Sequence, residues 1–411
     1  MKKLILILPV LFFSNVFSQE IQKDTIRGKD IEEVLIVTSS RTEQKSENSP
    51  QKVEVLGKEE MQEESTIKPA GIASILGDVS GVQIQQTSAV SGNSNVRIQG
   101  LDGRYTQILK DGMPLFDGFS GGLGVLNIPP LDLQQVELIK GSASTLYGGG
   151  AIGGLVNIVS RKPTVKQELT ILTNYSTLSE KNLNLFASKK FRKLGYTFFV
   201  GETSQSAKDI NKDGFSDVSK INSLVIHPKL FFYPSQMATI SIGWSGSFDK
   251  NTGGDINVID GRADQNHQFF ETNKTQRNTY ELIYDQKFKD NSKLSFKNSL
   301  SNFNRNFSSN QNFLNAGQQN YFSEASYVMH KNTMSWVFGL DFQGSKFTPK
   351  SFQNFQLPKF DNSSTGLFVQ NSLKFNKTNI ETGIRQDFTK NFGTFFLPQV
   401  AIIHHFNEHW A

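Results

Sequence analysis

The chain of 411 residues contains no cysteine, so neither disulfide bonds nor thiolate metal ligands contribute to its structure. Its six histidines form no zinc motif, and the adjacent His404 and His405 would face opposite sides of a strand. No nucleophile, base and orienting group can be assembled from local motifs. The sequence therefore indicates neither an enzyme nor a protein with a bound cofactor.

Long apolar runs are missing after the first residues, and the mean hydropathy of the chain is −0.37. No later stretch approaches the roughly 20 apolar residues that a transmembrane helix needs. Insertion into a membrane must therefore use a β-barrel, whose strands satisfy one another's backbone groups. The formal charge of +5 is too small to indicate binding to nucleic acid.

The first 18 residues are the exception to this polarity. Lys2 and Lys3 precede an apolar run over residues 4–13, and small or modest residues follow where a signal peptidase cuts. This order predicts a secretory signal peptide over residues 1–18. A buried N-terminal strand or helix is the alternative.

Turn and strand signals cluster in one part of the first half of the chain. Asp111 and Gly112 tolerate positive φ angles and predict a type I′ hairpin, and Pro114, which cannot donate to a ladder, places it at a sheet edge. Residues 136–140 alternate apolar and charged, which predicts a strand with one wetter face. Residues 155–159 form a β-branched run typical of a buried strand.

A glycine motif in the same region is a false lead. Gly148, Gly150 and Gly153 satisfy the G-x-G-x-x-G pattern of dinucleotide sites, but that motif must open a helix. Here the strand-like residues 155–159 follow. We interpret the glycines as positions where backbones pack closely.

The segments of this region together carry a family resemblance. In chain order they are Val96-Arg97-Ile98-Gln99-Gly100-Leu101, Gln107-Ile108-Leu109-Lys110-Asp111-Gly112-Met113-Pro114, Val136-Glu137-Leu138-Ile139-Lys140-Gly141, Leu146-Tyr147-Gly148 and Gly153-Gly154-Leu155-Val156-Asn157-Ile158. Their order resembles the plug domain of TonB-dependent receptors, which take scarce nutrients through the outer membrane of Gram-negative bacteria. The resemblance implies a small α/β plug domain followed by a transmembrane antiparallel β-barrel.

A β-prone segment near the N-terminus also fits this family. A lone strand between two polar stretches cannot bury its own faces, so it is suited to adding to the sheet edge of another protein. It resembles the TonB box, the segment that the inner-membrane energy-coupling protein TonB grips. The residues are Glu33, Val34, Leu35, Ile36, Val37 and Thr38. The alternative is an ordinary first strand of the plug.

Composition and periodicity divide the chain into four parts. They are the signal peptide at 1–18, a flexible segment with the TonB box at 19–49, the plug domain at 50–163 and a partial transmembrane β-barrel at 164–411. Within the plug, Ile72, Ile75 and Leu76 have the spacing of a short helix.

The last part alternates apolar and polar residues with a period of two. Trp244 and Trp336 lie on apolar faces, which we expect to contact outer-membrane lipid, whereas Asp341 and Lys374 lie on the opposite, lumenal faces. Short turns alternate with longer polar stretches, the rhythm of periplasmic turns and external loops. The longer stretches are 205–220, 250–276, 308–318 and 348–363. We count about 12 strands, against about 22 in plugged transporters, and therefore expect an incomplete barrel.

A receptor of this class should hold its ligand at the outer loops of the plug, which the resemblance assigns to residues 85–95, 100–105 and 114–124. Their polar and aromatic side chains suit a bulky metal chelate. The candidate contacts are Gln86, Asn93, Arg104, Tyr105, Phe116 and Phe119. A ferric siderophore is the expected substrate. A receptor for haem, cobalamin or an oligosaccharide, or a passive channel or adhesin, is the alternative.

One polar stretch partly fits a calcium loop. Asp209, Asn211 and Asp213 alternate ahead of Gly214, but the twelfth position is Lys220 rather than a bidentate glutamate. The competing interpretation is a solvated loop tip that uses aspartate, asparagine and glycine for turns.

Overall fold

A computed structural model describes residues 35–36, 41, 44–45, 49–88, 90, 93–115, 128–353 and 357–406. The chain divides into two compact units, Met1–Glu33 and Val34–Ala411, and every described residue belongs to the second. The expected signal peptide and four TonB-box residues, Glu33, Val34, Val37 and Thr38, lie outside the described ranges.

The plug is built on a five-stranded sheet in the order β3 (Val53–Leu56), β8 (Leu133–Lys140), β9 (Gly154–Ser160), β6 (Thr106–Lys110) and β7 (Met113–Pro114). The predicted hairpin joins β6 to β7, and Asp111 and Gly112 have φ angles of 53° and 77°. Because β7 ends the sheet, Pro114 lies on an edge strand, as predicted.

One face of this sheet packs against two helices, α1 (Lys58–Ile67) and α2 (Ala73–Gly77). Ile72, Ile75 and Leu76 are buried in that core, which confirms the short helix inferred from their spacing. None of the helices in the described ranges is long and apolar enough to cross a membrane.

The prediction of a wetter face on β8 is wrong. Glu137 is 0% exposed, and Ile139 on the same face packs with Leu109 and Leu155. The Glu137 carboxylate accepts a hydrogen bond from Gln135 Nε2 at 2.8 Å. The charged residue is therefore not a sign of solvent, because this side of the sheet is covered as well.

The remaining plug elements are short. They are the hairpin of β4 (Val82–Ser88) and β5 (Asn93–Ile98), the 3₁₀ turns η2 (Gly103–Tyr105), η3 (Pro130–Asp132) and η4 (Gly149–Ala151), and the helix α3 (Ser144–Tyr147). η4 leads directly into strand β9 and not into a helix, in agreement with rejecting the dinucleotide motif.

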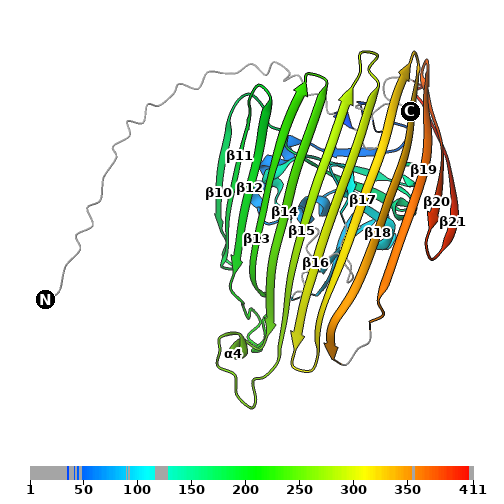
Figure 1. The fold of residues 1–411 in the computed structure, drawn as a ribbon. Helices are drawn as coiled ribbons and strands as arrows, with labels where there is room; N and C mark the ends of the chain where they lie inside the picture. The colour runs from blue at the N-terminus through cyan, green and yellow to red at the C-terminus, as the bar shows by residue number, and fades with distance from the viewer. Residues whose placement is uncertain are drawn as a thin grey trace, which may run out of the picture. The chain divides into compact units, whose positions relative to one another are not determined.

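The rest of the described chain forms one antiparallel sheet of 12 strands, each paired with its neighbours in sequence (Figure 1). The count agrees with the 12 strands expected from alternation, and β10 and β21 are its two edges within the described residues. The strands are β10 (Glu168–Tyr175), β11 (Glu180–Lys190), β12 (Leu194–Gln205), β13 (Lys220–Ser235), β14 (Ala238–Gly254), β15 (Phe270–Lys287), β16 (Lys293–Ser309), β17 (Phe313–Lys331), β18 (Met334–Gln353), β19 (Phe360–Phe375), β20 (Thr378–Thr389) and β21 (Gly393–His404).

The two faces of this sheet differ as predicted. On β18, Phe338 and Leu340 are 42% and 47% exposed, whereas Asp341 is 3% exposed. Trp336 stacks on Phe338 with ring centroids 5.9 Å apart, which places both on the outer, apolar face. Trp244 likewise shares a face with the exposed Ile242.

The longest connections lie at one end of the sheet, although the connections 176–179, 310–312 and 390–392 at that end are short as well. At the opposite end the strands are joined by short turns, three of which contain an asparagine with positive φ: Asn291, Asn332 and Asn376. The longer connections include the loop with helix α4 (Ile256–Ile259) beyond β14 and β15 (Figure 1). The long loop expected at 308–318 is wrong, because β16 and β17 extend to Ser309 and Phe313.

Candidate functional site: the plug apex and the plug–wall cavity

The β4–β5 hairpin marks the plug surface at the long-loop end, which we call the apex. Val90 near its tip lies so close to Gly253 that a Cβ on that glycine would come within 2.4 Å of Val90 Cγ2. Gly253 is at the end of β14 from which the α4 loop departs. The tip of the hairpin therefore points toward the long connections.

Two of the predicted ligand contacts lie beside this hairpin in η2. Gly103 packs against Asn95 of β5, where an added Cβ would meet Asn95 Cβ at 2.9 Å. Arg104 donates from Nε to Asp102 Oδ1 at 3.0 Å, and its side chain is 73% exposed. Tyr105 is 42% exposed. Both side chains are thus open to a ligand.

The other predicted contacts are less defined. Gln86 and Asn93 belong to β4 and β5, and their side chains are not described. Phe116 and Phe119 lie outside the described residues.

Asp102 is the N-cap of η2, and hydrogen bonds from the Arg104 backbone and side chain lower the pKa of its carboxyl.

The possible calcium residues make turn contacts. Asp209 accepts hydrogen bonds from the backbone amides of Lys212 and Gly214 at 2.7 and 2.8 Å. Asn211 Oδ1 accepts from the Asp213 amide at 3.0 Å. These contacts match the alternative of a loop tip with local turn chemistry. Within the described ranges, no three acidic or histidine side chains cluster as metal ligands would.

The N-terminal segment is paired within the chain itself. β1 (Leu35–Ile36) pairs antiparallel with β2 (Gln44–Lys45), and Ile36 is 0% exposed. The expectation of a lone strand is therefore wrong for these two residues. This short ladder does not test the assignment of residues 33–38 as the TonB box, which stays a prediction.

Arg41, between these two strands, joins the segment to both the plug and the sheet wall. Its Nη2 donates to Glu324 Oε2 on β17 at 2.6 Å and lies 3.4 Å from the Leu146 carbonyl oxygen, and its guanidinium stacks 4.2 Å from the Tyr147 ring centroid. Burial disfavours the charge, but the Glu324 carboxylate outweighs this and raises the pKa of Arg41. Nothing local in the sequence singled out Arg41.

A second set of plug–wall contacts surrounds the predicted hairpin turn. Lys229 of β13 donates to Asp111 Oδ2 at 2.7 Å and to Glu281 at 3.5 Å. Burial opposes ionisation of Asp111, but Lys229 and Lys110 outweigh it and hold the pKa of its carboxyl well below the usual range. Lys110 Nζ also lies 3.2 Å from His227 Nδ1 on the wall.

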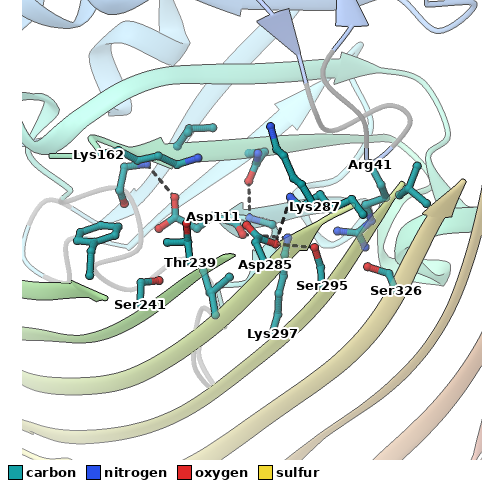
Figure 2. Close-up of a pocket in the computed structure, with 18 of the residues that line it drawn as sticks. Arg41, Asp111, Lys162, Thr239, Ser241, Asp285, Lys287, Ser295, Lys297 and Ser326 are labelled. Carbon is teal, nitrogen blue, oxygen red and sulfur yellow. Dashed lines mark hydrogen bonds and ion pairs between the residues drawn. The ribbon is translucent and has the colours of Figure 1, made fainter. Parts of the chain in front are cut away.

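Between these two sets lies a cavity of about 530 Å³ at the short-turn end of the sheet (Figure 2). The plug contributes Asp111, Gly112, Tyr147, Asn157 and residues 159–162, and the wall contributes residues of β13 to β17 and of the turn between β15 and β16. Figure 2 shows Arg41, Asp111 and Lys297 around it. Its lining is rich in lysine and arginine, which the alternation of β-strands alone does not predict.

A third contact anchors helix α3. Leu146 packs against Val328, Val337 and Phe368 of the wall. Nearby, Arg385 binds both carboxylate oxygens of Asp341 at 2.7 and 3.0 Å. In the sequence, Phe368 is an aromatic residue at a position of β19 where the alternation puts polar, inward-facing side chains. This exception to the alternation is the signal that could have located the contact with the plug.

A plug domain packed against an antiparallel, two-faced sheet is the arrangement of plugged outer-membrane β-barrel proteins. Two family models match: the TonB-dependent Receptor Plug Domain over residues 45–155, and the TonB dependent receptor-like beta-barrel over residues 223–411. The chain belongs to the TonB-dependent receptor family.

Relatives with curated names match part of their own length. The chain is 26% identical over 262 residues to the iron-regulated outer membrane virulence protein of Vibrio cholerae, covering 60% of this chain and 38% of that protein. It is 32% identical over 132 residues to the vitamin B12 transporter BtuB of Photobacterium profundum, covering 31% and 20%. The chain thus spans well under two thirds of these relatives.

Solved structures share the fold at low identity. A mutant of the ferric enterobactin receptor PfeA from Pseudomonas aeruginosa has a TM-score of 0.70 and 15% identity, covering 87% of this chain and 60% of that one. The siderophore receptor PirA from the same organism has a TM-score of 0.68 and 18% identity, with 87% and 59% covered.

Proposed function

We propose that the protein containing this chain takes up a ferric siderophore across the outer membrane, with energy supplied through TonB. The observation that carries the proposal is the opposite placement of two features on one plug. The β4–β5 hairpin, with the exposed Arg104 and Tyr105 beside it, lies toward the long loops. The segment with Leu35 and Ile36 is instead tied by Arg41 beside the short-turn cavity. This arrangement suits a receptor that binds its ligand at the apex and its energy-coupling partner at the short-turn end.

The substrate class is supported by the names of relatives and by the apex chemistry. Several similar proteins are named as receptors for ferric enterobactin or as iron-regulated. Tyr105 offers an exposed aromatic ring, and Arg104 an exposed cation, which together suit a bulky anionic chelate. Cobalamin is the second candidate, because the chain also matches BtuB.

In this proposal residues 33–38 act as the TonB box, and residues 1–18 are removed on export. A strand has two hydrogen-bonding edges, and β2 pairs with one edge of Leu35 and Ile36. TonB would therefore add its own strand at the other edge or take the place of β2.

The test uses the full-length receptor in cells with and without the energy-coupling protein, supplied with an iron-loaded catecholate siderophore or with cobalamin. We expect siderophore uptake that requires the coupling protein. Leu35→Pro should abolish uptake and preserve surface binding, because proline removes a donor that the partner strand needs. Gln44→Pro is the matched control, since it breaks the internal pair and leaves the proposed box intact.

Uptake that continues without the coupling protein would contradict the energised mechanism and favour a passive channel. Loss of surface binding in Leu35→Pro would instead assign this strand to the plug core. Uptake of cobalamin in place of the siderophore would change the substrate but leave the coupling intact.

A further inference from the structure

We infer that the short-turn cavity is a binding site for a small anion with at least two carboxylate groups. The site lies on the side of the plug away from the apex, so it is distinct from the proposed ligand contacts there. The role of this site, which is to hold an anionic substrate as it leaves the receptor, rests on the proposed function. The binding of the anion to the site is tested separately.

The first positive pole lies at the hairpin turn. Lys297 Nζ donates to the Asp111 carbonyl oxygen at 3.1 Å, and a Cβ on Gly112 would come within 2.3 Å of the same amine and 3.5 Å of Arg41 Nη1. A Cβ here would force the Lys297 amine to shift, and the positive φ of 77° itself favours glycine. The Lys297 amine and the Arg41 guanidinium therefore lie close together beside Gly112.

This pole has spare capacity for an anion. Lys297 bonds to a neutral carbonyl and forms no ion pair within the part of the chain that the structure describes. Arg41 is paired with Glu324 through Nη2, but its buried Nε has no hydrogen-bond acceptor among the described residues. A buried donor without an acceptor is costly, so an oxyanion at this point would be favoured.

The second positive pole comes from the end of β9. Lys162 is exposed, lines the cavity and forms no ion pair with a described residue. Arg161 beside it donates from Nε to the Leu133 carbonyl oxygen at 3.0 Å and lies 3.9 Å from the Glu168 carboxylate. By contrast, the two acids in the lining are already engaged, Asp111 by Lys229 and Asp285 by Lys293 at 3.1 Å.

Size and polarity fit the same ligand. A volume of about 530 Å³ lies within the usual range for small-molecule sites, roughly 300–1,000 Å³. The hydroxyl groups of Thr239, Ser241 and Ser326 also line the cavity (Figure 2). Two separated positive poles select a ligand with two anionic groups over one with a single charge.

The experiment uses citrate as the probe and the full-length receptor in detergent. Citrate affinity is measured calorimetrically, and acetylation of each lysine is followed by mass spectrometry with and without citrate. We expect citrate to protect Lys297 and Lys162. Lys297→Gln and Lys162→Gln should each weaken binding by about tenfold, since each removes a charge-assisted hydrogen bond, while Lys297→Arg stays close to the parent.

Lys374→Gln is the matched control, because Lys374 is exposed near the short-turn end but lies outside the cavity lining. Siderophore binding at the cell surface verifies that each variant is folded. Unchanged citrate affinity in Lys297→Gln, equal protection of all lysines, or equal protection by glycerol would overturn the inference. Citrate binding that depends on Lys297 in a receptor without energised uptake would refute the proposed function and leave this site standing.

Discussion

Arg41 and Glu324 are 283 positions apart in the sequence, yet their side chains are joined at 2.6 Å with both groups buried. One belongs to the N-terminal segment and the other to an inward position of β17. The pair therefore ties the segment that contains the proposed TonB box directly to the wall, and breaking it should release that segment.

Arg41→Gln should raise the mobility of a spin label attached at Leu35→Cys, measured by electron paramagnetic resonance. The label is specific because the chain has no cysteine. Losing one partner of a buried ion pair costs about 3–5 kcal/mol, enough to open a two-residue ladder. Glu324→Gln should have a similar effect.

Arg104→Gln is the control for that experiment, since this arginine is exposed at the apex. A spectrum in Arg41→Gln as immobile as that of the parent would show that the β1–β2 pair and the buried Ile36 hold the segment without the ion pair.

The two faces of the wall give a second prediction. Leu340→Arg places a charge on the outer face of β18 and should cost about 2–4 kcal/mol near the middle of the membrane, whereas Gln343→Arg on the inner face should be mild. Assembly in the outer membrane, followed by heat-dependent migration on gels, measures the difference. Equal assembly defects would contradict the assignment of faces. Asp341 is unsuitable as the inner-face partner, because both its oxygens bind Arg385.

Much of the wall could be predicted because its signal is local. Outer and inner side chains alternate every two residues, so Phe338, Leu340 and Asp341 reveal their faces within one strand. The same logic failed at residues 308–318, where β16 and β17 continue through polar sequence. A strand that is polar on both faces has no alternation to detect and resembles a loop.

The contacts that bring the site together could not be predicted in this way. Lys229, Lys297 and Glu324 look like ordinary lumenal polar residues until the plug is placed beside them. Their partners Asp111 and Arg41 are more than a hundred residues away, and their pairing depends on tertiary packing rather than on local pattern. The turn at Asp111 and Gly112 was predictable. That the Lys297 amine and the Arg41 guanidinium lie beside this turn was not predictable.

A third prediction concerns pH and the α4 loop. His267 Nδ1 lies 2.6 Å from Asp255 Oδ2, the N-cap of α4. The hydrogen bond with Asp255 raises the pKa of His267. Desolvation opposes the ionisation of Asp255, but His267 and the Asn257 amide outweigh it and lower the pKa of that carboxyl. Both residues are charged only at pH values between the lowered pKa of Asp255 and the raised pKa of His267.

For His267 the raised pKa means that the stabilisation is complete below its unfolded value of about 6.5 and is lost as the pH rises through the folded value. For Asp255 the lowered pKa means that stabilisation is present above about 3.9 and is lost as the pH falls through the folded value. Amide hydrogen exchange in residues 255–269, corrected for intrinsic rates, should therefore show more protection at pH 5.5 than at pH 8.5. His267→Gln should remove that difference, and a difference that persists in this variant would point to another group.

The last prediction tests the apex as the ligand site. Tyr105→Ala in the full-length receptor should weaken ferric siderophore binding about tenfold, because an exposed aromatic ring supplies apolar and stacking contact area to a bulky chelate. Arg104→Gln should weaken binding of an anionic chelate and have little effect on neutral cobalamin, since it removes one exposed positive charge. Equilibrium binding to intact cells measures both, with receptor abundance determined in parallel. Tyr175→Ala is the matched control, because this tyrosine is 68% exposed at the end of β10 and outside the apex. Undiminished affinity in Tyr105→Ala and Arg104→Gln would move the ligand contacts from the plug to the long connections of the wall, since these are the other groups that face the same end of the sheet.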